Sequence, residues 1–193
     1  MDTQSPPSTL VIDRTTVLSL FAALSVLIIA YAASLRLLHA STTIKFRILF
    51  IWHLFDSLIH FTFEGSFLYN CFFTYTSVPH ASDYPHPASL TSPSVYFMGD
   101  ADRLYGSQYG TSPTAKLWQE YAKADKRWGG ADLTVVSLEL LTVFGAGPLA
   151  AYICELIRRR DGGGKLWFWA SVLATGELYG GKRSALQADY REH

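Results

Sequence analysis

The sequence predicts an all-α, multi-pass transmembrane helical bundle with four apolar helices, of which the fourth is short. Composition is the first observation: hydrophobic residues make up 49% of the 193 residues and charged residues only 17%, whereas soluble domains carry roughly 25% charged residues. The second observation is a set of apolar stretches long enough to cross a bilayer as helices. The third is the charge balance of 16 basic and 16 acidic residues, without a basic face. This balance argues against nucleic acid as a partner and leaves the lipid bilayer as the expected surroundings.

The first predicted span covers residues 15–38 and follows a short tail over residues 1–14. It lacks charges between Arg14 and Arg36, and a bilayer core of about 30 Å needs roughly 20 helical residues. A cleaved signal peptide is the alternative interpretation. The apolar run is longer than the apolar region of such a peptide, and residues 32–34 resemble a cleavage site only faintly, so we favour the span.

Two further spans are predicted at residues 48–73 and 133–157, and a shorter apolar helix at residues 166–180. The third span contains a Gly-x-Gly-Pro sequence that begins at Gly145. We expect a kink there, because neighbouring helices can satisfy the carbonyl group that a proline leaves free. The fourth helix is expected to stop before a Gly-Gly-Lys-Arg sequence, which leaves residues 181–193 as a divergent polar tail.

Residues 74–131 are predicted to form a loop outside the membrane, because they contain five prolines and many polar residues. One helix is expected within this loop, at residues 114–127. Its Trp118 and Tyr121 stand among charged residues, as aromatic side chains at a membrane interface do. The membrane domain as a whole is then assigned to residues 15–180.

The orientation follows from the basic residues of the two short connections between spans. Both connections lie on the same side if each apolar run crosses once, so we expect this side to be the cytosol. The N-terminus and the loop at residues 74–131 would then face the lumen. The basic residues are Arg36, Lys45 and Arg47 in the first connection, and Arg158, Arg159, Arg160 and Lys165 in the other.

The second span carries ionisable residues within an apolar sequence. Asp56, His60 and Glu64 follow each other at intervals of four, and His53 precedes Asp56 by three, so a helix places them on one face. Each charged side chain at mid-membrane costs about 2.5–3.5 kcal/mol on insertion scales, so this face should point into the bundle. The pattern predicts a buried functional site or a polar contact between helices.

A second ionisable group stands in the third span, where Glu139 is followed by Thr142 one turn later. If the helices are neighbours, His60, Glu64 and Glu139 could meet at one depth. A carboxyl group in an apolar cavity can act as a general acid, and an ionised carboxylate favours a positive charge that develops nearby. The chemistry that fits is proton addition and removal at an apolar molecule through a carbocation, which needs no cofactor.

One alternative interpretation of the ionisable residues remains open. The ionisable residues can form a hydrogen-bond cluster that only holds helices together, since polar side chains also connect spans. Cys71 and Cys154 lie in apolar stretches without a paired-cysteine spacing, and they predict neither a disulfide nor a zinc site. No metal site is therefore expected from the sequence.

Four blocks of sequence resemble the emopamil-binding protein family, the sterol Δ8-Δ7 isomerases of the wider EXPERA superfamily. The resemblance covers residues 45–180 and keeps the order of the family's motifs. The blocks are residues 60–65 (HFTFEG), 117–127 (LWQEYAKADKR), 139–142 with 147–149, and 176–180 (GELYG).

The resemblance implies an endoplasmic reticulum membrane protein that shifts the double bond of a sterol or related polycyclic lipid by protonation and deprotonation. It implies that His60, Glu64, Glu139 and Thr142 form the catalytic group. Substrate-binding roles would fall to an acidic and aromatic lining and to the loop motif. These binding residues are Asp56, Phe63, Phe67, Trp118, Tyr121, Asp125, Arg127 and Tyr179.

The sequence departs from the family after Gly180. The family has five helices, so the chain is expected to be truncated at its C-terminus, and Glu177 stands where the family more often has Gln. The face left open could pair with a second copy of the chain, which makes a homodimer possible. Two other functions also remain: cyclisation of a prenylated specialised metabolite, and non-catalytic binding of sterols or amphiphilic amines.

Overall fold

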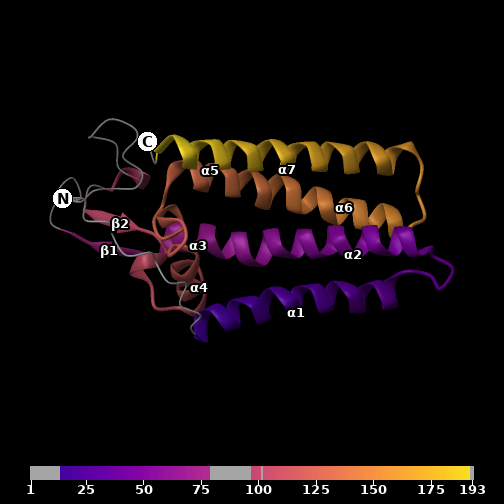
Figure 1. The fold of residues 1–193 in the computed structure, drawn as a ribbon, viewed down its shortest axis with the longest axis horizontal. Coiled ribbons are helices and arrows are strands. Elements are labelled where there is room, and N and C mark those ends of the chain that lie inside the picture. The colour runs from indigo at the N-terminus through magenta and orange to yellow at the C-terminus, as the bar shows by residue number, and fades with distance from the viewer. Residues whose placement is uncertain (1–13, 79–96, 101, 192–193) are drawn as a thin grey trace, which may run out of the picture.

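Four helical rods lie side by side in the computed structural model, and a small extramembrane unit covers one end of them (Figure 1). The structure describes residues 14–78, 97–100 and 102–191. The membrane-side elements are α1 (Arg14–Leu37), α2 (Ile44–Ile59), η1 (His60–Glu64), α3 (Gly65–Phe73), α5 (Leu133–Leu141), η6 (Thr142–Ala146), α6 (Gly147–Arg158) and α7 (Gly164–Arg191). The end unit contains β1 (Tyr75–Ser77), η3 (Phe97–Gly99), β2 (Arg103–Tyr105), η4 (Ser107–Tyr109), α4 (Pro113–Tyr121) and η5 (Lys126–Trp128).

Within the described residues, three helices are long and apolar enough to cross a membrane: Thr16–Leu37, Ile44–Phe73 and Leu133–Arg158. They match the three long spans predicted from the sequence, and the all-α membrane bundle is confirmed. Helix α1 packs on α2, α2 packs on α6, and α6 packs on α7. The protein is therefore a multi-pass membrane protein whose long helices follow one another in space in chain order.

Helix α7 differs from its prediction, because it does not end near residue 180. It runs from Gly164 to Arg191, a length of 28 residues. Each glycine inside a helix costs only about 1 kcal/mol relative to alanine. The Gly180-Gly181 pair is followed by good helix formers, and a helix that is already nucleated continues through such a weak point. The expected short helix with a divergent tail after residue 180 is thus corrected to one long helix.

The loop predicted at residues 74–131 contains more regular structure than expected. Strands β1 and β2 form an antiparallel pair in which Thr76 lies opposite Leu104. The helix expected at residues 114–127 ends earlier, because α4 stops at Tyr121 and the 3-10 turn η5 follows. Residues 79–96 of the predicted loop lie outside the described residues.

Helix α1 turns most of its large hydrophobic side chains outward. A helix that is apolar around its whole circumference suits lipid on its free faces. The exposed side chains include Leu18, Leu20, Phe21, Leu24, Ile28 and Ile29. The two short connections, α1 to α2 and α6 to α7, lie together at the end opposite the extramembrane unit (Figure 1), as the orientation argument requires. Arg160 Nη2 donates to Ser41 Oγ at 2.8 Å and joins them.

The two central rods of the bundle are α2–η1–α3 and α5–η6–α6, and each contains a π-helical turn at the same level. Turn η1 separates α2 from α3, turn η6 separates α5 from α6, and the two turns pack against each other. In a regular α-helix the ring of Pro148 would clash with the carbonyl group four residues earlier. The wider turn η6 lies over that position, so the irregularity predicted near Gly145 takes the form of a π-turn.

Gly147 lets the two rods approach closely. A Cβ atom at this position would lie 3.1 Å from the Cβ of His60 and 3.4 Å from the ring of Phe61. Ser57 Oγ also donates to the carbonyl oxygen of Gly147 at 2.9 Å. The close contact places η1 directly beside the start of α6.

We predict that Gly106→Ala destabilises the extramembrane unit. Gly106 has a φ of 132°, and an added Cβ would lie 2.5 Å from the Cα of Gly130. Strained backbone and overpacking each cost about 1–3 kcal/mol. Thermal unfolding of the purified protein in detergent should show a lower midpoint. Gly176→Ala is the control, because nothing lies within 4 Å of its Cβ position; equal midpoints for the two variants would contradict the prediction.

Candidate functional site

The ionisable residues meet at the paired π-turns. His60 and Glu64 are the first and last residues of η1, and Thr142 is the first residue of η6. Single π-turns inside α-helices occur frequently at functional sites. The sequence neighbours of these residues are apolar, so the polar group is enclosed by the two central rods and by α7.

Glu64 is the centre of this group. Its Oε2 atom accepts a hydrogen bond from His60 Nδ1 at 2.6 Å and another from Thr142 Oγ1 at 2.5 Å. The second bond connects the two central rods. Thr142 Oγ1 also lies 3.1 Å from the carbonyl oxygen of Glu139, its own helix neighbour. Two donors on one carboxylate oxygen fix the position of this carboxylate.

Glu139 lies behind Glu64. It is only 4% exposed, and its side chain is in hydrogen-bonding contact with the carboxyl group of Glu64. Two ionised carboxylates at this separation repel strongly in apolar surroundings, so the arrangement favours a proton held between them. The four residues predicted as the catalytic group are therefore brought together by the fold.

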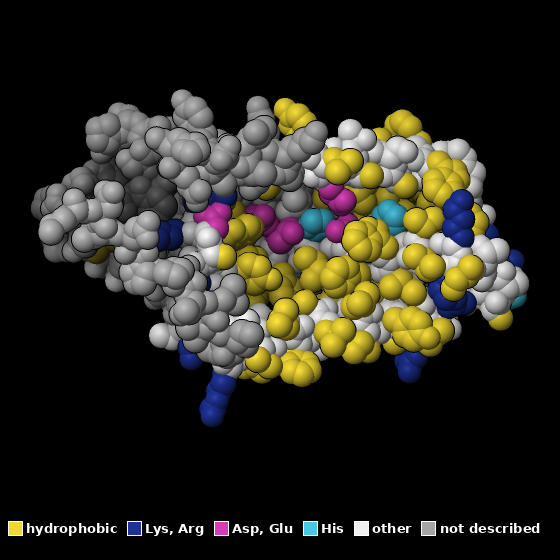
Figure 2. Space-filling model, viewed as in Figure 1, with side chains coloured by type: hydrophobic (Ala, Val, Ile, Leu, Met, Phe, Trp, Pro, Cys, Tyr) yellow, Lys and Arg dark blue, Asp and Glu magenta, His cyan; other side chains and the backbone are white. Residues whose placement is uncertain are grey.

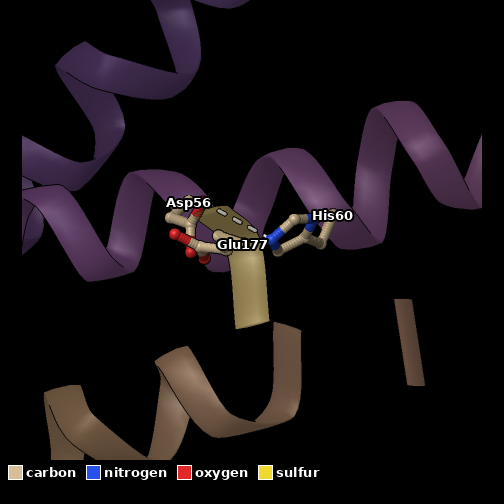
Figure 3. Close-up of side chains that lie close together, drawn as sticks. All are labelled: Asp56, His60 and Glu177. Carbon is tan, nitrogen blue, oxygen red and sulfur yellow. Dashed lines mark ion pairs between the residues drawn. The ribbon is translucent and has the colours of Figure 1, made fainter. Parts of the chain in front are cut away.

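A second acidic pair lies on the other side of His60. His60 Nε2 is 3.4 Å from Asp56 Oδ1, and Glu177 of α7 points toward both side chains (Figure 3). One ligand-type atom from each of the three side chains lies within 4.8 Å of the others. Three separate helical segments thus contribute to one group of four carboxyl groups around a single imidazole.

The group is enclosed but reaches the surface. The side chains of Asp56 and Glu64 are 19% and 18% exposed, and that of His60 is 8% exposed. Figure 2 shows acidic and histidine side chains in a row along the middle of one face, among hydrophobic side chains. Part of the acidic group is therefore open at the surface of the molecule, on a largely apolar face (Figure 2).

The predicted aromatic binding residues separate into two groups. Phe67 is fully buried and packs edge-on against Trp118 and Trp128, with ring centroids 5.2 and 5.1 Å away. Trp118 stacks on Trp128 and donates from Nε1 to Ser66 Oγ at 2.9 Å. These rings form the core between α3 and the extramembrane unit. They pack together against α3, which follows η1 in the chain.

Asp125 and Arg127 form a forked ion pair in the extramembrane unit. Arg127 donates from Nε to Asp125 Oδ2 at 2.9 Å and from Nη2 to the same atom at 2.5 Å. The hydrogen bonds that Arg127 donates to Asp125 raise the pKa of the Arg127 guanidinium above its usual value. The pair closes the turn before Trp128, so its position is that of a structural clamp beside the aromatic core.

Tyr121 and Tyr179 are exposed at the surface, with 44% and 63% of their area accessible. Phe63 is half-buried and borders a cavity of about 440 Å³ between α1, η1 and α4. The carboxyl groups of Glu64 and Glu139 do not line this cavity, so it is separate from the polar group. A second cavity lies between the two short connections at the opposite end of the bundle.

Three features of the site were not predicted from the sequence. Glu177 was noted only as a departure, and its contact with Asp56 and His60 depends on the packing of α7. The π-turns leave no residue pattern of their own, apart from the glycines and proline near η6. Asp132 is 1% exposed and accepts hydrogen bonds from the backbone of Thr134 and Val135 at the start of α5. An aspartate directly before an apolar run is the typical sequence signal of a helix N-cap.

We predict that Thr142→Val loosens the contact between the central rods. Valine keeps the shape but removes the donor to Glu64, and a hydrogen bond to a charged group contributes about 1.5–3 kcal/mol. Thermal unfolding in detergent should show the loss. Thr62→Val is the matched control, because its exposed hydroxyl bonds only its own helix, at Leu58 O. A similar shift in both variants would show that the interhelical bond contributes nothing.

The comparison with known families agrees with this architecture. The model of the EBP family, described as EXPERA (EXPanded EBP superfamily), matches residues 113–187. The matched segment begins at α4, contains Glu139, Thr142 and Glu177, and extends through most of α7. His60 and Glu64 lie outside it. The matched segment is thus similar to the EBP family of the EXPERA superfamily, and the membrane bundle agrees with this similarity.

Proposed function

We propose that the protein is a cholestenol Δ-isomerase of the endoplasmic reticulum membrane, which moves a sterol double bond from Δ8 to Δ7. Similarity of residues 113–187 to the EBP family, which is related to sterol isomerases, supports the substrate class. The observation that carries the proposal is the meeting of His60, Glu64, Glu139 and Thr142 at two packed π-turns. A proton-transfer group of this kind inside an apolar bundle suits an apolar substrate.

The proposed reaction balances without a cofactor. A proton adds to C9 of the C8=C9 double bond and leaves a carbocation at C8. A different proton then leaves C7, and its bonding electrons form the C7=C8 double bond. One proton enters and one leaves, so neither oxidant nor reductant is required. The surrounding carboxylates lower the energy of the cation, because they are fixed negative charges in a low-dielectric site.

The exposure of the side chains suggests separate roles. Glu64 is partly exposed and His60 donates directly to it, and these are the two side chains that we assign to proton transfer. Glu139 is almost fully buried behind Glu64, so it would act through Glu64 as a positioning residue that shares a proton with it. Thr142 would hold the carboxylate of Glu64 in place through its 2.5 Å hydrogen bond.

The apolar face in Figure 2 suggests the approach of the substrate. Sterol rings are rigid and apolar, and they would lie among hydrophobic side chains while the double bond stays beside the acidic row. The same geometry suits two alternatives. Cyclisation of a prenylated metabolite would use the same acid and cation stabilisation, whereas a binding protein for sterols or amphiphilic amines would use only the charge.

We predict that Glu64→Gln lowers the rate of Δ8 to Δ7 conversion by about 10²–10⁴-fold, the range typical of a lost acid–base group. Glutamine keeps the size and hydrogen-bonding shape but cannot exchange the proton. The purified protein in nanodiscs is incubated with a Δ8 sterol, and the product is measured by mass-resolved chromatography. Equilibrium binding of the same sterol to each variant is measured in parallel and should change little.

Glu155→Gln is the matched control, since its carboxylate pairs with Arg158 and Arg159 at the far end of α6. It should convert sterol at the wild-type rate. Binding by the wild-type protein without any double-bond migration would favour the non-catalytic alternative. Turnover that survives in Glu64→Gln would remove Glu64 from the mechanism.

A further inference from the structure

The side of His60 that faces away from Glu64 carries three buried polar atoms that have no hydrogen-bond partner among the described residues. These atoms are Asp56 Oδ2, His60 Nε2 and Glu177 Oε1. Figure 3 shows that the three side chains converge, with Asp56 and His60 on one helical rod and Glu177 reaching across from α7. His60 itself is 6% exposed. Buried polar atoms are nearly always satisfied, so this convergence calls for a ligand.

The contact between His60 and Glu64 determines which ring nitrogen is available. A carboxylate oxygen can only accept, so Nδ1 of His60 carries the proton that it donates to Glu64 at 2.6 Å. In the neutral ring, Nε2 then holds the lone pair and is directed toward Asp56 and Glu177. A histidine that donates one ring N–H to a carboxylate and presents the other nitrogen is the usual arrangement of a metal ligand.

The spacing and chemistry of the three side chains fit zinc. Zinc binds histidine nitrogen and carboxylate oxygen at about 2.0–2.2 Å in a tetrahedron, which separates neighbouring ligand atoms by roughly 3.4 Å. His60 Nε2 and Asp56 Oδ1 are already 3.4 Å apart, and all three ligand atoms lie within 4.8 Å of one another. Small rotations of the Glu177 side chain would complete three corners, leaving the fourth for water.

We propose that Asp56, His60 and Glu177 form a binding site for one Zn²⁺ ion, with Glu64 as the hydrogen-bond partner that orients the His60 ring. The ion would supply the positive charge that this group of carboxyl groups lacks. It would also hold α7 against the rod formed by α2 and η1. Zinc is favoured over magnesium or calcium because imidazole suits zinc, whereas the other two ions prefer oxygen ligands alone.

The site has a consequence for catalysis, which rests on the proposed function. An ion on Nε2 occupies the lone pair of His60 and fixes the ring, so it would remove His60 from proton transfer. Zinc should therefore inhibit sterol isomerisation reversibly, and a chelator should restore it. Zinc binding is measured without any sterol, so its outcome does not depend on whether the protein is an isomerase.

The test measures binding of Zn²⁺ alone to the full chain in detergent, after treatment with a chelator. Isothermal titration should give one site per chain in the wild-type protein. Glu177→Gln and Asp56→Asn should each weaken the affinity at least tenfold, whereas Glu155→Gln should leave it unchanged. Thermal unfolding of each apo variant identifies any that fail to fold, and Zn²⁺ should raise the midpoint of the wild-type protein but not that of Glu177→Gln.

Cobalt provides a spectroscopic check on the ligands, because Cys71 and Cys154 are free thiols within the bundle. Co²⁺ at the proposed site should give the visible bands of a four-coordinate ion with nitrogen and oxygen ligands, and no thiolate charge-transfer band. A thiolate band would overturn the proposal, as would absent zinc binding in the wild-type protein or equal affinity in Glu177→Gln. Zinc binding without sterol turnover would instead contradict only the isomerase activity.

Discussion

The need to pair ionisable side chains inside a membrane governs this structure. Asp56, His60 and Glu64 stand on a helix that is otherwise apolar, and each such charge facing lipid would cost about 2.5–3.5 kcal/mol on insertion scales. The fold places them against η6 and α7, where the bond from Thr142 to Glu64 joins the two central rods. Gly147 makes this possible, since its missing side chain lets the rods approach to contact distance. Packing and polar pairing thus require the same geometry.

The sequence predicts most of the membrane architecture and part of the site. Long apolar stretches locate the spans, and the four-residue spacing predicts that His60 contacts Glu64, because both depend only on local helix geometry. Contacts across helices are different. The position of Glu177 beside Asp56 depends on how α7 packs, which no local pattern encodes. The continuation of α7 past Gly180 is not predicted by the sequence, because two consecutive glycines indicate a helix end, although the helix formers after them outweigh this signal.

The extramembrane unit acts as a rigid support for η1. Phe67 is enclosed by Trp118 and Trp128, and the Asp125–Arg127 pair closes the turn from which Trp128 projects. Aromatic packing of this kind adds about 0.5–1.5 kcal/mol per pair beyond area burial. The binding roles that the resemblance implies for these residues stay a prediction, and the contacts that they make in the structure are those of a core around α3.

The position of Glu177 on the last helix gives the biosynthesis of this protein an order. Ribosomes deliver the chain from its N-terminus, so Asp56 and His60 enter the bilayer well before α7 leaves the exit tunnel. Until that helix arrives, the second rod carries acidic and imidazole groups that lack one of their neighbours. A nascent chain in this state presents polar groups to lipid, which is the feature that membrane chaperones and quality-control proteases detect. The polar group around His60 is then complete only when α7 has been translated and inserted.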